Sequence, residues 1–181
     1  TDQAKCMMDA VTLLSQYDIK PILVGGAQSY LILDFLKDHS ISIVLNSCHR
    51  LPTTDEEDIE MPYKLPALLH NKGIPFCFSL QKDPWQLRNL PFQAGTAIAY
   101  GLPYAAAIHA LTDTPARMLR IEDVYGTLEK GKSATLFLSK GDPLDMISED
   151  VYLAYIDGRK INLDDKQKQL YEKFKKKYRM N

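Results

Sequence analysis

The sequence has 181 residues, a formal net charge of −1, 45% hydrophobic residues and 25% charged residues. This composition is typical of a globular protein of one to one and a half domains and not of a disordered segment. The near-neutral charge offers no overall attraction to nucleic acid or to a membrane surface, and the apolar runs are far too short to span a bilayer. We therefore expect neither nucleic acid nor a membrane as a partner.

Two features of the sequence bear on the cellular compartment: the cysteines and the first residues. The three cysteines are odd in number and lack CxxC spacing, so no disulfide framework is expected and each should be a small buried residue. The residues from Thr1 onward show neither an initiator methionine nor a signal peptide. We interpret Thr1 as a cut end of a longer protein. The compartment therefore stays unknown: it is the cytoplasm or, if a signal lies on the missing part, the periplasm.

The first half of the chain predicts alternating helices and strands. Helices are expected at residues 2–17, 27–37 and 62–71, and strands at residues 22–24, 41–45 and 74–80. Asp2 is expected to cap the first helix, because a short acceptor side chain satisfies free backbone N–H groups there. The third strand is apolar throughout, as in a parallel sheet covered on both faces. Strands separated by helices at this spacing predict βαβ organisation.

The second half of the chain predicts a different arrangement of helices and strands. A long alanine-rich helical section is expected over residues 90–119, with a break at Gly101. Three short strands are expected at residues 133–138, 151–156 and 159–161, with a hairpin turn at Asp157-Gly158 between the last two. The final residues, 164–181, predict a helix with one apolar stripe and a basic, solvated face.

Several segments of residues 90–162 occur in an order and spacing that point to a known family. They read LPFQAGTAIAYGL (90–102), AAAIHALT (105–112), DTPA (113–116), YGTLEKGKSATL (125–136) and GDPLD (141–145). This order resembles the end of amidohydrolase-superfamily enzymes, especially the imidazolonepropionase-like group. In that family a helix leads out of a barrel into a small β-sandwich through a glycine-rich turn. Here Thr135 stands where the family commonly has an aspartate.

The resemblance implies an α/β fold in three parts. Residues 1–120 would supply about the last three βα units of a TIM-type barrel, residues 121–163 a β-sandwich portion of a composite domain, and residues 164–181 a C-terminal helix. The strands at 22–24, 41–45 and 74–80 would then be the sixth, seventh and eighth barrel strands. Because a complete barrel needs about 250 residues, most of the first five strands would lie outside this chain.

The resemblance also implies a chemistry, which is hydrolysis of carbon–nitrogen bonds other than peptide bonds. In the family, histidines, a lysine and an aspartate at strand ends hold a divalent metal such as zinc, which activates water. This sequence has no HxH motif and has Gly25-Gly26 at the end of the sixth strand. Gln81 falls near the aspartate position, and Asp83 lies two residues later. We expect no metal site in this chain, and Gln81 and Asp83 are the remaining candidates for a catalytic group.

Three basic residues are candidates for substrate binding. His49 and Arg50 follow the seventh strand, at the end where barrel enzymes carry active-site loops; the alternative is a solvated loop. Arg88 follows the eighth strand and could bind a carboxylate with its planar guanidinium. Alternatively, Arg88 pairs with the acidic loop of residues 55–60. Cys48 is adjacent to His49, which is poor geometry for a nucleophile and its base.

Two functions stay open from the sequence. The chain is part of an amidohydrolase-like hydrolase of a small-molecule substrate and is inactive by itself, or it comes from a degenerate amidohydrolase that serves as a binding or scaffold module. An open parallel sheet exposes strand edges that invite pairing. We therefore expect association with the remainder of the barrel or self-association.

Overall fold

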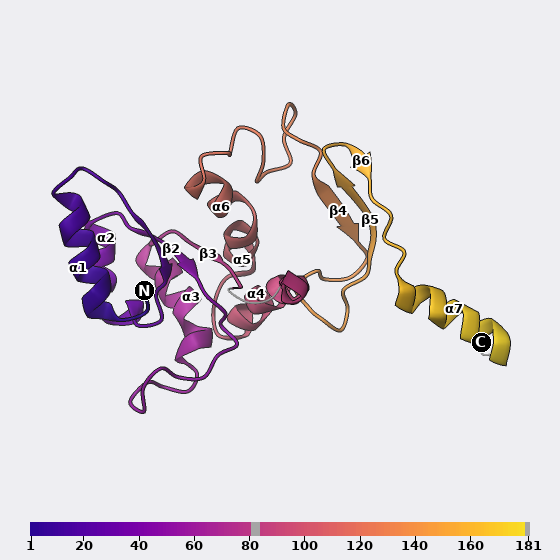
Figure 1. Cartoon of the computed structure of the whole chain (residues 1–181), viewed down its shortest axis with the longest axis horizontal. Helices are drawn as coiled ribbons and strands as arrows, with labels where there is room; N and C mark the ends of the chain where they lie inside the picture. The colour runs from indigo at the N-terminus through magenta and orange to yellow at the C-terminus, as the bar shows by residue number, and fades with distance from the viewer. Residues whose placement is uncertain (81–83, 180–181) are drawn as a thin grey trace.

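The structure is a computed structural model that describes residues 1–80 and 84–179. The predicted candidates Gln81 and Asp83 lie outside the described residues. Figure 1 shows a helical and parallel-sheet part, a separate antiparallel sheet, and a last helix that projects away from both. Among the described residues, no helix has the length and apolar character that crossing a membrane requires.

A parallel sheet of three strands organises the first part of the chain. Its strands are β1 (Ile22–Gly25), β2 (Ser42–Leu45) and β3 (Phe76–Phe78), in that order. The register places Leu23 opposite Ile43, and Ile43 opposite Phe76. The predicted α/β class and βαβ order are therefore confirmed. That these strands form part of a TIM-type barrel stays a prediction.

Helices cover one face of this sheet. They are α1 (Ala4–Ser15), α2 (Leu33–Asp38) and α3 (Met61–Lys72). Each contributes at least one fully buried side chain to a common core with Ile43, namely Met7 and Val11 from α1, Leu36 from α2 and Leu69 from α3. α3 ends where it was predicted to end, because Gly73 adopts the left-handed conformation, with φ of 76°, that suits glycine.

Two local predictions near β1 are wrong. Asp2 does not cap α1: its Oδ1 atom accepts the backbone N–H of Ala27 at 3.2 Å, and the N–H of Ala4 donates to Gln28 Oε1 at 3.1 Å. The helix expected at residues 27–37 is divided into a 3₁₀ turn, η1 (Ser29–Leu31), and α2. Both differences arise because the loop after β1 and the start of α1 bond to each other, which periodicity within one segment cannot reveal.

The alanine-rich section forms three helices with a break at the predicted place. They are α4 (Leu90–Ala99), α5 (Tyr104–Leu111) and α6 (Asp113–Met118), and α4 follows a 3₁₀ segment, η2 (Pro84–Asn89). Ala94, Ala97 and Ala107 are completely buried. Small side chains therefore let these helices pack closely.

Gly95 in α4 is a point of close approach. A Cβ atom built on Gly95 would overlap the carbonyl oxygen of Leu144, a buried residue of the segment that connects the first two strands of the second sheet. Only glycine fits this contact without movement of one of the two backbones.

Replacement of Gly95 by alanine is expected to lower the free energy of unfolding by about 1–3 kcal/mol. Helix propensity alone would raise it by about 1 kcal/mol, so the two effects have opposite signs. Urea unfolding of the variant and the parent protein measures the difference. A variant as stable as its parent would show that the segment at Leu144 moves away from α4 at little cost.

The second sheet is small and antiparallel. Its strands are β4 (Leu136–Ser139), β5 (Val151–Ile156) and β6 (Arg159–Lys160). The predicted hairpin turn is present, with φ of 48° at Asp157 and 77° at Gly158. A β-sandwich requires a second sheet that packs on this one, and that part stays a prediction.

The last helix, α7 (Lys166–Tyr178), begins at Asp165, whose side chain accepts the N–H of Lys168 at 2.8 Å. No side chain of α7 is buried. Its apolar stripe is therefore exposed, although the predicted spacing of Leu170 and Phe174 is present.

Candidate functional site

The loop after β2 carries the polar groups at the carboxyl edge of the parallel sheet. Two cavities open beside it, of about 80 Å³ and about 380 Å³, and Ser47 lines both. The carboxyl edge of a parallel sheet is where α/β proteins ordinarily bind ligands. The site is therefore built around residues 46–60 and the elements that hold them.

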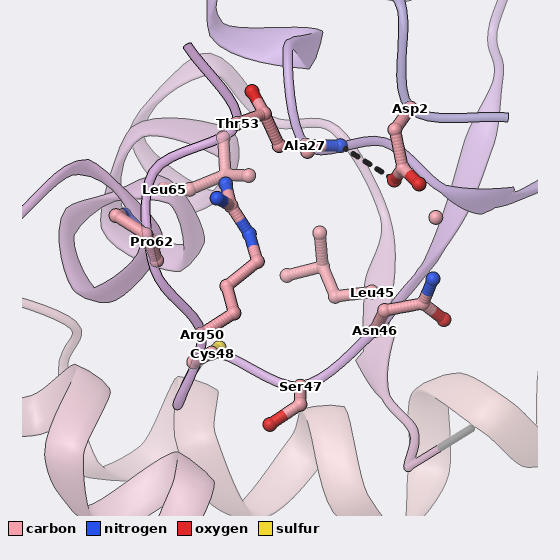
Figure 2. Close-up of a pocket in the computed structure, with 11 residues that line it drawn as sticks. Asp2, Ala27, Leu45, Asn46, Ser47, Cys48, Arg50, Thr53, Pro62 and Leu65 are labelled. Atoms are coloured by element: carbon pink, nitrogen blue, oxygen red, sulfur yellow. Dashed lines mark hydrogen bonds between the residues drawn. The ribbon is translucent and has the colours of Figure 1, made fainter. Parts of the chain in front are cut away.

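The smaller cavity lies between the loop and the start of the chain. Figure 2 shows Leu45 pointing into it, Arg50 along one side, and Asp2 on the other side beside Ala27. Asn46 stands at its rim, and among the described residues its buried Oδ1 atom has no hydrogen-bond partner. Arg50 thus lines a cavity, and binding of substrate by Arg50 stays a prediction.

Arg50 is bound to a buried carboxylate. Its Nη2 atom lies 2.7 Å from Glu57 Oε1, and its Nη1 atom lies 3.3 Å from Glu57 Oε2. The side chain of Glu57 is completely buried and also accepts the hydroxyl of Thr53 at 2.8 Å. Burial by itself would raise the pKa of Glu57, but the hydrogen bonds from Arg50 and Thr53 outweigh it and hold the pKa below its ordinary value. The pair fixes the course of the loop.

Gln93, from α4, holds the other end of the loop. It is 3% exposed, and its Oε1 atom accepts the backbone N–H groups of Cys48 at 2.7 Å and His49 at 3.1 Å. The hydroxyl of Ser47 also donates to this atom at 3.3 Å. Because all three partners are donors, the amide orientation of Gln93 is determined, and its Nε2 group points to His49.

His49 has a single tautomer that satisfies its neighbours. Gln93 Nε2 can only donate, so His49 Nδ1, at 2.8 Å, is the acceptor. His49 Nε2 then carries the proton and donates to Thr96 Oγ1 at 2.7 Å, while this hydroxyl donates to the carbonyl of Phe92 at 3.0 Å. His49 is therefore held neutral, and both of its ring nitrogens are engaged.

Partial burial lowers the pKa of His49 below its ordinary value of 6.5. The unfolded chain therefore takes up this proton first as the pH falls. The stability that neutral His49 contributes is expected to be complete above about pH 6.5 and to be lost as the pH falls from there to the lower pKa of the folded state. Urea unfolding at a series of pH values, compared with a His49→Gln variant, measures the effect. An identical pH dependence in the two proteins would contradict it.

The remaining basic candidate, Arg88, lies in η2, with its guanidinium 5.7 Å from the centre of the Trp85 ring. The acidic loop forms its ion pairs with other cations: Arg50 binds Glu57, and Lys64 binds Asp58 and Glu60. Binding of substrate by Arg88 stays a prediction. His49 and Arg50 are neighbours in sequence but face different cavities.

The cysteines are all free. Cys48 and Cys77 are buried as predicted, whereas Cys6 is exposed, because its side chain lies on the outer face of α1. Burial raises the pKa of Cys48 to about 12, so its thiolate is strongly disfavoured at neutral pH. This agrees with the weak case for a cysteine nucleophile.

The described residues do not fit a metal centre. Zinc takes three or four ligands from histidine, cysteine and carboxylates. Within residues 1–80 and 84–179, no group of three such side chains stands close enough to hold a metal ion. The ends of β1 and β2 offer glycine, Asn46 and Ser47, and both ring nitrogens of His49 are already bonded.

Two residues of the site, Gln93 and Glu57, were missed by sequence reasoning. Gln93 stands among Ala94 and Ala97 on the buried side of α4, and a single polar residue on an apolar helix face is a signal that it bonds to something. Glu57 has no such signal, because it is one of five acidic residues between positions 55 and 60.

Comparisons with known proteins find solved structures that are similar to this chain. No protein-family model and no curated protein matches the sequence. An amidohydrolase from Thermotoga maritima MSB8 has a similar structure, with a TM-score of 0.77 and 26% identity, over 90% of this chain and 42% of that chain. A Xaa-Pro dipeptidase with bound methionine has a TM-score of 0.55 and 22% identity, over 72% of this chain and 36% of that chain.

A third similar structure is a prolidase complexed with N-methylphosphonate-L-proline. Its TM-score is 0.64 at 13% identity, over 86% of this chain and 43% of that chain. The last two similarities concern the fold alone. In each case this chain spans less than half the length of the solved protein. The resemblance seen in the sequence is therefore confirmed: solved proteins of similar structure are amidohydrolases, and this chain corresponds to a part of their longer chains.

Proposed function

We propose that this chain forms one wall of the substrate pocket in an amidohydrolase-type hydrolase that cleaves carbon–nitrogen bonds other than peptide bonds. The observation that carries the proposal is the loop after β2, which borders two cavities at the carboxyl edge of the sheet and is fixed by Gln93 and Glu57. A pocket wall must hold its side chains in place before substrate arrives. This loop meets that requirement.

In this proposal the described residues position the substrate and exclude water, and the attacking group comes from elsewhere in the protein. His49 offers a neutral ring at the larger cavity, and η2 contributes Gln86 and Asn89 to the lining. Arg88 lies between these two residues in the sequence of η2, and we propose that its guanidinium reaches the substrate. A divalent metal such as zinc would have to be held by residues other than the described ones. This chain by itself is expected to be inactive.

The test uses the longest polypeptide that the gene encodes. We expect turnover of cyclic or open-chain amides, and we expect Arg88→Met to lower kcat/KM at least about tenfold through loss of a charged hydrogen-bond donor. The matched control is Arg117→Met, since Arg117 binds Asp113 on α6 away from the cavities. Hydrolysis of Xaa-Pro dipeptides in preference to amides would contradict the predicted bond class.

A second candidate is a binding or scaffold module. It is favoured by the bonds of His49 and Arg50, since all ring nitrogens of His49 and the guanidinium of Arg50 are already engaged. This function predicts saturable binding of small amides to the longest polypeptide, with no turnover and no metal retained after purification. Stoichiometric metal together with turnover would exclude it.

A further inference from the structure

Uncharged polar side chains line the larger cavity beside the loop after β2. Its volume of about 380 Å³ is in the ordinary range of small-molecule sites. The polar side chains of the lining are those of Ser47, His49, Gln86, Asn89 and Gln93. No described residue of the lining is an acid, a lysine or an arginine, and the hydrogen bonds of His49 keep its ring neutral. A charged ligand group would therefore find no opposite charge among these side chains.

The polar side chains of the lining differ in what they can still bind. The hydroxyl of Ser47 and the ring of His49 bond to Gln93, and both ends of the Gln93 amide are engaged by the loop. The hydrogen bonds among the described residues do not include the side-chain amides of Gln86 and Asn89, which are partly buried. These two amides therefore keep donors and acceptors for a ligand.

The geometry of η2 directs these two amides to the same side. A 3₁₀ helix has three residues per turn, so residues three positions apart lie one above the other. Gln86 and Asn89 have this spacing, and both line the cavity. Trp85 and Arg88 share the neighbouring, exposed face of η2, where the guanidinium lies 5.7 Å from the centre of the Trp85 ring. The cavity thus receives a pair of amides from η2.

A pair of amides selects a ligand by the type of hydrogen bond that the ligand can form. Each side-chain amide offers N–H donors and a carbonyl acceptor. A carboxamide or a lactam offers both kinds of group in return, whereas a carboxylate can only accept and an amidinium group can only donate. Either ion would also bring an unpaired charge into the cavity. Gln86 and Asn89 therefore favour an uncharged amide.

Apolar side chains complete the lining. They are those of Leu80, Phe92 and Met146. An aromatic ring and a thioether both make favourable contacts with a planar apolar group. Met146 is 67% exposed, so such a group would also remove apolar surface of this side chain from water.

We propose that the larger cavity binds an uncharged carboxamide or lactam attached to a planar apolar group, and that Gln86 and Asn89 determine this specificity. Their side chains bind the amide, and Phe92 and Met146 contact the apolar group. This recognition gives the proposed hydrolase its substrate class and rests on that function, although binding itself requires no turnover. A contact of Arg88 with the substrate would then involve a part of the substrate outside the cavity.

Three ligands of nearly equal shape test the proposal. At neutral pH benzamide is uncharged, benzoate is an anion and benzamidinium is a cation. In NMR titrations of the longest polypeptide that the gene encodes, benzamide should bind at least about tenfold more tightly than either ion. Asn89→Asp and Gln86→Glu each replace one amide by a carboxylate of the same shape. Each variant should bind benzamide more weakly and should prefer benzamidinium.

The matched control is Gln169→Glu, which adds the same charge on α7, the helix that projects away from both sheets (Figure 1). This variant should keep the order of affinities of the parent protein. Preference of the parent for benzoate, equal affinity for the three ligands, or binding of none of them would overturn the proposal. An unchanged preference for benzamide in Asn89→Asp and Gln86→Glu would overturn it as well.

The results for binding and for turnover can be separated. Selective binding of benzamide that depends on Gln86 and Asn89, without turnover of any amide, would support this recognition and contradict the proposed hydrolase activity. Turnover of amides by a protein that shows no preference for benzamide would contradict this recognition and leave the hydrolase activity supported.

Discussion

Replacement of Gln93 by leucine is expected to lower the free energy of unfolding by about 3–5 kcal/mol. The Oε1 atom of Gln93 accepts the N–H groups of Cys48 and His49, and leucine would leave both without a partner. A buried donor without a partner costs about 1–3 kcal/mol, so two such donors account for the expected loss. Urea unfolding monitored by circular dichroism measures it.

Gln93→Glu is the matched control. The carboxylate keeps an acceptor for both N–H groups, so the variant should retain more stability than Gln93→Leu. A carboxylate facing His49 Nδ1 also favours the protonated ring, so the pKa of His49 should rise from its lowered value. NMR titration of the His49 ring measures the change. Equal stability losses in the two variants, with an unchanged titration of His49, would show that Gln93 acts only by filling space.

Replacement of Arg50 by methionine is expected to lower the free energy of unfolding by about 3–5 kcal/mol. The carboxylate of Glu57 is completely buried and would lose its cation, and an unpaired buried charge is the costly state. The matched control is Lys64→Met, since Lys64 pairs with Asp58 and Glu60 at the surface. Surface pairs contribute about 0–1 kcal/mol.

The stability that the pair of Arg50 and Glu57 contributes should decrease as the pH falls. The pKa of Glu57 in the folded protein lies below its ordinary value of 4.5, so the stability from the pair is complete above about pH 4.5 and is lost as the pH falls through the lower value. In Arg50→Met the burial of Glu57 has no cation to oppose it, and acid should destabilise this variant less. The double variant Arg50→Met/Glu57→Leu should recover part of the loss. No recovery would indicate that Arg50 acts through contacts other than Glu57.

The elements that the sequence predicts well are those with a strong local pattern. The parallel strands are short apolar runs between helices, and the break at Gly101 interrupts the alanine-rich section. The hairpin at Asp157-Gly158 needs two residues that tolerate positive φ, and both are there. Each of these features is determined by residues that are close together in the sequence, so it can be predicted from the sequence alone.

The sequence indicates where the candidate residues lie in the chain, but it does not indicate the hydrogen bonds that set their chemical state. His49 and Arg50 follow β2 and each lines a cavity at the carboxyl edge, and substrate binding by either residue stays a prediction. The state of His49 depends on Gln93 and Thr96, which are 44 and 47 positions away. Such contacts follow from the packing of α4 against the sheet and have no periodic signature in the sequence. The same applies to Asp2, which bonds to Ala27 and not to its own helix.

The close fit of Gly95 against Leu144 joins α4 to the segment between β4 and β5. Gln93, two residues earlier on the same helix, fixes the loop at His49, and Met146, two residues after Leu144, lines the larger cavity with it. The antiparallel sheet is therefore anchored to the element that shapes the pocket wall. We therefore expect a displacement of that sheet to move α4 and, through Gln93, the ring of His49.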